Sequence, residues 1–140
     1  MTMIDVEVNG LEGLMIDMRK ASKIPNDVLK EMVTAQADIV QQEITSNATT
    51  MLLGPYYEGD VAASVKAKKA RVSRTGAYVD ITFNGTAHGN RLGEIAFVNE
   101  YGKKSQPARP FIKTALTKSR DLAADAAHKV LSDFLSKNGL

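Results

Sequence analysis

Cysteine is absent from the 140 residues of the chain, which excludes disulfide bonds, thiolate metal sites and cysteine nucleophiles. This absence suits a reducing compartment, and synthesis in the cytoplasm is the default expectation. The sequence also begins without a basic leader and apolar run, and no segment reaches the roughly 20 apolar residues that cross a bilayer. We therefore expect a soluble protein with no signal peptide and no membrane partner.

Histidine is scarce, and the sequence motifs of common enzymes are missing. His88 and His128 have no carboxylate pairing pattern near them. There is no HExxH, nucleophile elbow, phosphate loop or dinucleotide fingerprint. The glycine-rich run 85–89 precedes a predicted strand, so it lacks the helix N-terminus that binds phosphate. The sequence predicts no catalytic residue, no metal site and no cofactor, and a small hydrolase or transferase would need a constellation that is not found.

Net charge is only +2, but it is distributed unevenly. Residues 1–62 carry four Lys/Arg against ten Asp/Glu, residues 63–102 carry six against three, and residues 103–140 carry eight against three. Two interpretations stay open. The segments neutralise one another within one fold, or an acidic face of one copy meets a basic face of the next, as in a head-to-tail ring.

Apolar residues at spacings of three and four predict two long helices, at about 26–47 and about 110–136. Pro25 and Pro110 stand where a first helical turn tolerates a missing N–H, and Asn138-Gly139 supplies a stop. Leu11, followed by further apolar residues at helical spacing, predicts a short helix at about 11–20.

Alternation of apolar and polar residues predicts a small antiparallel sheet of three to four strands. The predicted strands are 61–73, 77–83 and 94–101, with 4–8 as a further candidate. Within 61–73 the apolar residues other than Ala62 stand at odd-numbered positions up to Ala67 and at even-numbered positions from Ala70. This change indicates a bulge or bend around Lys68-Lys69. Together with the helices, these strands predict an α+β fold with a single domain over residues 1–140.

Basic residues cluster on the β-hairpin predicted for residues 61–83 and again before the last helix. The first cluster is Lys66, Lys68, Lys69, Arg71 and Arg74; the second is Lys103, Lys104 and Arg109. A basic hairpin can grip phosphates, although no aromatic residues for base stacking are interleaved with it. Lysines on an edge strand also prevent unwanted strand pairing. A small DNA-binding module that uses the hairpin 66–74 is therefore the alternative function.

Two motifs resemble the signature of the tail-completion proteins of tailed phages, the small neck or minor tail components that join tail to head. The first is Phe97-Val98-Asn99-Glu100-Tyr101-Gly102 followed by Pro107-Ala108-Arg109-Pro110-Phe111-Ile112 and Ala115-Leu116. The second is Pro55, Gly59, Asp60, Val61 and Ser64, with Glu58 where threonine is usual and Val61 where leucine is. The resemblance covers about residues 6–136.

This resemblance implies a non-enzymatic virion structural protein of the tail or neck, made in the cytoplasm of the host bacterium. It implies self-assembly into a ring, often a hexamer, and contacts with the tail tube protein and the head-completion or connector protein. DNA would pass through the ring without sequence-specific binding. The family-motif residues are Gly59, Ser64, Phe97, Glu100, Tyr101, Gly102, Pro107, Arg109, Pro110 and Phe111.

We expect structural roles for these motif residues. Phe97 and Phe111 are predicted to anchor the core, Tyr101 to pack the end of a strand that Gly102 terminates, and the prolines to stiffen the connection. Glu100 is predicted to accept hydrogen bonds from loop N–H groups or to pair with Arg109. The loops 84–93 and 102–108 are the expected contact surfaces, with His88, Arg91, Lys103 and Lys104 as the candidate assembly contacts.

Overall fold

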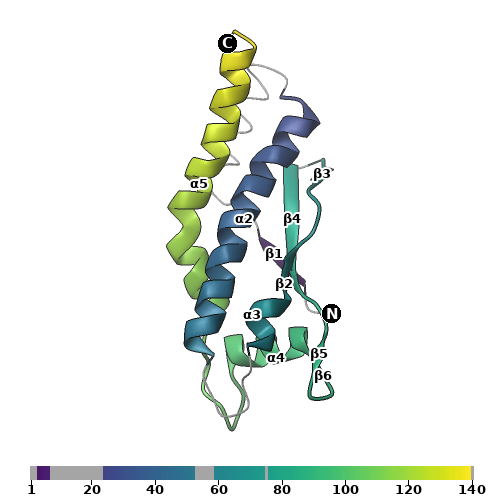
Figure 1. The fold of residues 1–140 in the computed structure, drawn as a ribbon, viewed down its shortest axis with the longest axis vertical. Coiled ribbons are helices and arrows are strands. Elements are labelled where there is room, and N and C mark those ends of the chain that lie inside the picture. Colours follow the sequence, from purple (N-terminus) through teal and green to yellow (C-terminus); the bar gives the residue numbers. More distant parts are fainter. Residues whose placement is uncertain (1–2, 7–23, 53–58, 75, 140) are drawn as a thin grey trace.

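The fold is a mixed arrangement of long helices packed against a small antiparallel sheet (Figure 1). The computed structural model describes residues 3–6, 24–52, 59–74 and 76–139. The helices are α2 (Asn26–Met51), α3 (Asp60–Ser64), α4 (Leu92–Tyr101) and α5 (Phe111–Lys137). The strands are β1 (Met3–Val6), β2 (Val65–Ala67), β3 (Arg71–Ser73), β4 (Gly76–Phe83), β5 (Thr86–Ala87) and β6 (Asn90–Arg91). The predicted α+β class is therefore confirmed.

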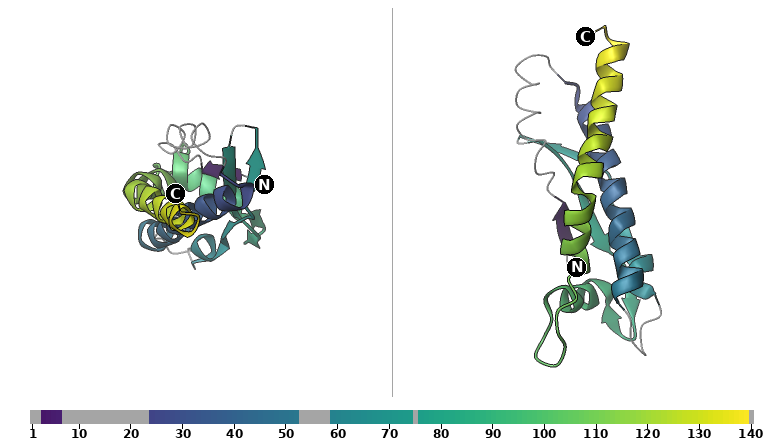
Figure 2. Two further views of the ribbon diagram at one scale, coloured as in Figure 1. Left: turned by 90° about the horizontal axis from the view of Figure 1, so that it is seen from above. Right: turned by 90° about the vertical axis from the view of Figure 1, so that its left-hand side faces the viewer.

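The two long helices run antiparallel, and α2 lies between α5 and the sheet (Figures 1 and 2). The buried stripe of α5 repeats every fourth residue and is built largely from small side chains, which allow the helices to approach closely: Ala115, Ser119, Ala123 and Ala127. Farther along, Leu29 and Met32 of α2 pack with Leu131. Both helices were predicted from their apolar spacing, and they end at residues 51 and 137.

β4 is the central strand of the sheet, with β1 on one side and β2 and β3 on the other. β1 pairs from Met3 opposite Thr82 to Val6 opposite Val79, which confirms the described part of the candidate strand 4–8. On β4, Ile81 and Phe83 are buried in the main core, where Phe83 meets the ring of Phe111 edge-on at 6.0 Å between centroids. The strand with the clearest alternation thus forms the middle of the sheet.

A one-residue bulge separates β2 from β3, as the change of apolar parity predicted. Ala67 lies opposite Ile81, and Arg71 lies opposite Tyr78. The outer strand therefore takes four residue steps where β4 takes three. Two residues of the outer strand thus lie opposite one residue of β4. The Lys68 N–H still donates to the Asp80 carbonyl at 2.9 Å. The hairpin predicted for residues 61–83 is therefore confirmed from Val65 onward, with this bulge.

Two parts of the predicted strands are wrong. Residues 61–64 form the short helix α3, and the predicted strand 94–101 lies within helix α4. In α4 the buried residues Leu92, Ala96 and Glu100 recur every fourth position, which is the period of a helix. This burial pattern outweighed the strand preference of the side chains between them. The predicted helix 11–20 lies outside the described residues, as do Val8, Pro55 and Glu58.

None of the described helices is long and apolar enough to span a lipid bilayer.

Candidate functional site

The connection between α4 and α5 carries most of the family-motif residues. It therefore joins two helices, whereas the sequence predicted a strand and a helix. It lies at one end of the elongated molecule together with α3 and the β5–β6 hairpin, and the C-terminus lies at the opposite end (Figures 1 and 2). This end of the molecule is the candidate site.

Glu100 fastens α4 to the first turn of α5. Its carboxylate accepts hydrogen bonds from the backbone N–H groups of Ile112, at 2.8 Å, and Lys113, at 3.0 Å. These N–H groups have no partner within the helix, and a negative charge is favourable at a helix N-terminus. Glu100 was predicted to accept hydrogen bonds from loop N–H groups or to pair with Arg109; it does accept backbone N–H bonds, but their donors belong to helix α5. Its buried carboxylate therefore caps α5 from another element.

Gly102 ends α4 in a conformation that suits glycine alone. Its φ is 78° and ψ is 176°, and its N–H donates to the Val98 carbonyl at 2.7 Å. A Cβ at this position would lie 2.8 Å from the backbone nitrogen of Ala108, closer than real Cβ contacts come. Gly102 thus ends a helix, and the absence of a side chain lets the returning loop approach closely.

The loop after Gly102 closes as a small hairpin. Lys103 and Gln106 exchange two backbone hydrogen bonds of 2.9 and 3.0 Å. The Gln106 amide donates to the Asn99 side-chain oxygen at 3.0 Å, and the Arg109 N–H donates to the Asn99 carbonyl at 2.6 Å. The bonds from Gln106 and Arg109 tie the returning side of the loop to α4. Lys103 and Lys104 remain exposed.

An aromatic pair lies on the exposed side of α4. Phe97 and Tyr101 are one helical turn apart, with ring centroids separated by 4.8 Å. Phe97 is 52% exposed and Tyr101 is 70% exposed. The predictions that Phe97 anchors the core and that Tyr101 packs a strand end are therefore wrong, because the helical period turns both side chains outward. We call Phe97, Tyr101, Lys103 and Lys104 the α4 end surface.

The β5–β6 hairpin projects at the same end of the molecule (Figure 1). His88 and Gly89 form its two-residue turn, with φ of 53° and 79°. Positive φ at both central residues matches the right-handed twist of a hairpin. His88 and Arg91, two of the predicted assembly contacts, are exposed here, as Lys103 and Lys104 are on the neighbouring loop. Their role in assembly stays a prediction.

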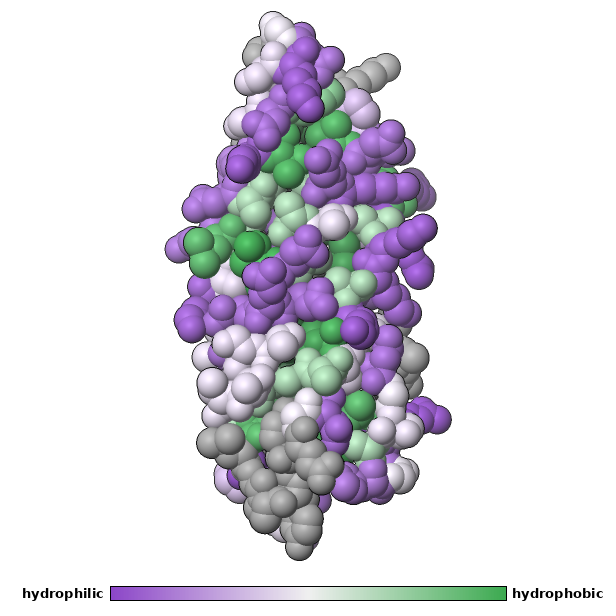
Figure 3. All heavy atoms as spheres, in the orientation of Figure 1, coloured by the Kyte–Doolittle hydropathy of each residue, from purple (hydrophilic) through white to green (hydrophobic). Residues whose placement is uncertain are grey.

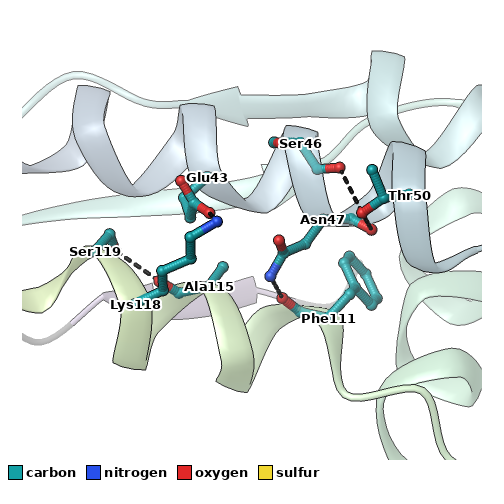
Figure 4. A network of polar contacts seen from close by, with 8 residues as sticks. All are labelled: Glu43, Ser46, Asn47, Thr50, Phe111, Ala115, Lys118 and Ser119. Atoms are coloured by element: carbon teal, nitrogen blue, oxygen red, sulfur yellow. Dashed lines mark hydrogen bonds and ion pairs between the residues drawn. The ribbon is translucent and has the colours of Figure 1, made fainter.

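Phe111, the last motif residue, is fully buried, which confirms its predicted role as a core anchor. The buried Asn47 of α2 donates from its side-chain amide to the Phe111 carbonyl at 3.1 Å (Figure 4). Beside this contact, Lys118 of α5 forms an ion pair with Glu43 of α2 at 2.9 Å. Of the other motif residues here, Pro107 is exposed, and Arg109 and Pro110 are half-buried.

The upstream motif shapes the entry to the sheet. Gly59 has φ of 82° and precedes α3, a left-handed conformation that glycine adopts without strain. Ser64 is buried at the other end of α3, where its hydroxyl donates to the Val61 carbonyl at 2.7 Å. The Ser64 carbonyl accepts from the Asn84 N–H at 3.0 Å. Gly59 and Ser64 therefore shape the two ends of α3, which packs against α2 and α4, and this is a structural role.

Three amide side chains that support this end were not predicted. Asn47, Asn99 and Gln106 each bond across the connection or within the loop. Asn99 and Gln106 lie within the stretch that resembles the phage family, and this location was the only feature of the sequence that could have pointed to them. Asn47 lies at the end of the predicted helix 26–47, and nothing in its local sequence indicates that its partner is 64 residues away.

The described residues offer no group of three or more His, Asp or Glu side chains that could hold a metal ion. An open hollow on α2 is lined by Asp38, Gln41, Gln42 and Thr45. It contains one carboxylate, and neither of the chain's histidines lines it. What the end of the molecule offers instead is an aromatic pair and exposed cations on a hydrogen-bonded joint, which suits contact with another macromolecule.

The chain was compared with protein-family models, with curated proteins and with solved structures, and none of the three comparisons found a match.

Proposed function

We propose that this protein is a non-enzymatic structural component of a tailed-phage virion, which completes the tail and joins it to the head through protein–protein contacts. Its partners would be further copies of itself in a ring, the tail tube protein and the connector. The observation that carries the proposal is the exposed aromatic pair on α4, held next to the lysine-bearing loop.

Exposed aromatic side chains in contact with each other are uncommon on the surface of an isolated domain. Phe97 and Tyr101 leave more than half of their surfaces in water, so covering them with a partner would gain hydrophobic free energy. Aromatic residues are also enriched where protein interfaces gain most of their affinity. The pair therefore supports a role in binding another protein.

The joint beneath the pair favours tight binding because its geometry is set before a partner arrives. Glu100 caps α5, Gly102 admits the loop, and Asn99 bonds the returning side of that loop. A surface that is already ordered loses less conformational entropy on association. The residues that carry the family resemblance thus build a support, and the support presents Phe97 and Tyr101.

A double substitution of the aromatic pair tests the proposal. In phage that produce Phe97→Ser/Tyr101→Ser, electron microscopy of lysates should find separate heads and tails. The matched control is Leu122→Ser, because Leu122 is 62% exposed on α5, outside the candidate site. Control particles should be joined as in the wild type.

Circular dichroism should give both variants the wild-type spectrum, since the substituted side chains lie on the surface. Joined particles from the double variant, or wild-type virions that lack this protein, would contradict the proposal.

A further inference from the structure

A second surface, along the outer strand of the sheet, is rich in basic residues. Five cationic residues follow one another along the outer strand: Lys66, Lys68, Lys69, Arg71 and Arg74. All five are exposed, and no acidic residue occurs between Asp60 and Asp80. We call these five residues the basic row. Hydrophilic side chains project along this edge of the molecule, on the right in Figure 3.

The bulge is what places the basic residues together. Ala67 and Ala70 both pack toward α2, against Val33, Ala37 and Val79. In a regular strand, residues three apart would point to opposite faces, so the extra residue restores the apolar side for Ala70. The residues opposite Thr82 and Tyr78 are Lys66 and Arg71, on the face away from α2. Lys68 and Lys69 lie between them at the bulge. Asp80 lies on the same face of β4, between Thr82 and Tyr78, and is buried.

The basic row also lies at an edge of the described sheet. β2 and β3 pair with β4, and no further described strand pairs with their outer side. The ion pair found between described residues joins Lys118 and Glu43, so it neutralises none of the five cations. No ion pair with another described residue therefore neutralises these five charges, and all five side chains are exposed to an anionic partner.

We propose that the basic row binds the phosphate backbone of double-stranded DNA without reading its sequence. From Lys66 to Arg71 the strand extends about 17 Å, at about 3.3 Å per residue. The same length of duplex carries about ten phosphate charges, at one per about 1.7 Å. Lysine and arginine side chains on a strand can therefore follow the backbone, and such contacts carry no sequence information.

Double-stranded DNA fits this surface better than an acidic protein or a single strand. Protein interfaces are depleted in lysine and enriched in aromatic residues, whereas the apolar members of this strand point toward α2. Single strands are held mainly by stacking of bases on aromatic rings. On this part of the sheet the exposed aromatic residue is Tyr78 alone among those described.

The test is DNA binding by the purified full chain, measured by fluorescence anisotropy from 50 to 200 mM salt with two unrelated duplexes. For five phosphate contacts the affinity should fall about 500-fold over this range, and equally for both duplexes. Lys68→Gln/Lys69→Gln should reduce that fall to about 40-fold, because each lost contact removes about 0.9 from the logarithmic slope. The matched control is Lys129→Gln/Lys137→Gln, two exposed lysines of α5 with the same change in charge.

Each result decides the matter. An unchanged slope in Lys68→Gln/Lys69→Gln, a control that weakens binding equally, or the absence of duplex binding at 50 mM salt would overturn the proposal. Polyglutamate that competes as well as DNA would also overturn it, in favour of an acidic protein partner. So would a variant that keeps wild-type DNA binding but aggregates, because the lysines would then only protect the sheet edge. The assay needs no phage partner, so its result is independent of the proposed virion function.

Discussion

Removing the Glu100 carboxylate should destabilise the whole fold, although Glu100 lies on a short helix near the surface. In Glu100→Ala, the N–H groups of Ile112 and Lys113 lose their acceptor. Hydrogen bonds to a charged group contribute about 1.5–3 kcal/mol each. Ile112 is buried, so its N–H loses most of that contribution, about 2 kcal/mol, whereas the N–H of exposed Lys113 regains water and loses about 1 kcal/mol. We therefore expect a loss of about 3 kcal/mol in the free energy of unfolding.

Urea denaturation followed by circular dichroism measures this loss, and the m-value should stay unchanged because the folded structure is retained. The melting temperature should fall by about 10 °C, at about 3 °C per kcal/mol for a chain of this size. Glu100→Gln keeps one acceptor oxygen and loses the charge, so its loss should be about half as large.

Glu94→Ala is the matched control, since Glu94 is an exposed glutamate on the same helix. Its effect should stay within about 0.5 kcal/mol. A loss below about 1 kcal/mol in Glu100→Ala, or an equal loss in Glu94→Ala, would refute the capping argument.

Four further substitutions test the packing and ion pairing of this part of the molecule by denaturation. Gly102→Ala should cost about 3 kcal/mol, since its Cβ would meet a backbone nitrogen at 2.8 Å, whereas Gly89→Ala, with similar φ and open space, should cost only about 1 kcal/mol. Phe111→Ala should cost about 3–5 kcal/mol because it leaves a cavity beside the sheet. Lys118→Ala should cost about 1 kcal/mol, because the ion pair joins a Lys118 side chain that is 68% exposed to a Glu43 side chain that is 22% exposed, so solvent screens it only in part. Equal losses in the two glycine variants, or a large loss in Lys118→Ala, would contradict these arguments.

The sequence correctly predicted those helices and strands in which the pattern of apolar residues along the element itself shows which side is buried. Val79, Ile81 and Phe83 alternate because one face of β4 packs on the helices, and the stripes of α2 and α5 repeat because each helix covers a core. The change of parity after Ala67 was sufficient to place the bulge. In all these cases a period of two or of three to four residues carries the information.

Helix α4 was missed because its buried face is not apolar enough to be recognised. Two of its three buried side-chain positions are Ala96 and Glu100, and Glu100 is buried only because α5 begins beside it. Ile95, Phe97 and Val98 favour strands, and they dominated the prediction. The exposure of Phe97 and Tyr101 follows directly from the helical period, so the main feature of the candidate site was lost with the same error.

The motif residues were predicted more reliably by their chemistry than by their elements. A carboxylate that accepts backbone N–H groups was expected at Glu100, and it exists, but its donors belong to a helix whose position depends on tertiary packing. The short helix α3 was likewise predicted as part of a strand, because its own sequence does not distinguish the two structures. Val61 and Val65 are both buried and lie four residues apart, a spacing that puts two side chains on the same side of a helix and also on the same face of a regular strand.

The bulge between β2 and β3 is also a position at which the fold can tolerate the deletion of a residue. Elsewhere in the sheet, insertion or deletion of one residue reverses the face of every side chain that follows, and within β4 it would turn Val79 or Phe83 away from the core. At the bulge the outer strand already has one residue more than its partner. Loss of either Lys68 or Lys69 would leave Ala67 opposite Ile81 and Arg71 opposite Tyr78, in regular pairing. Related chains that are one residue shorter at this position can therefore keep the same core.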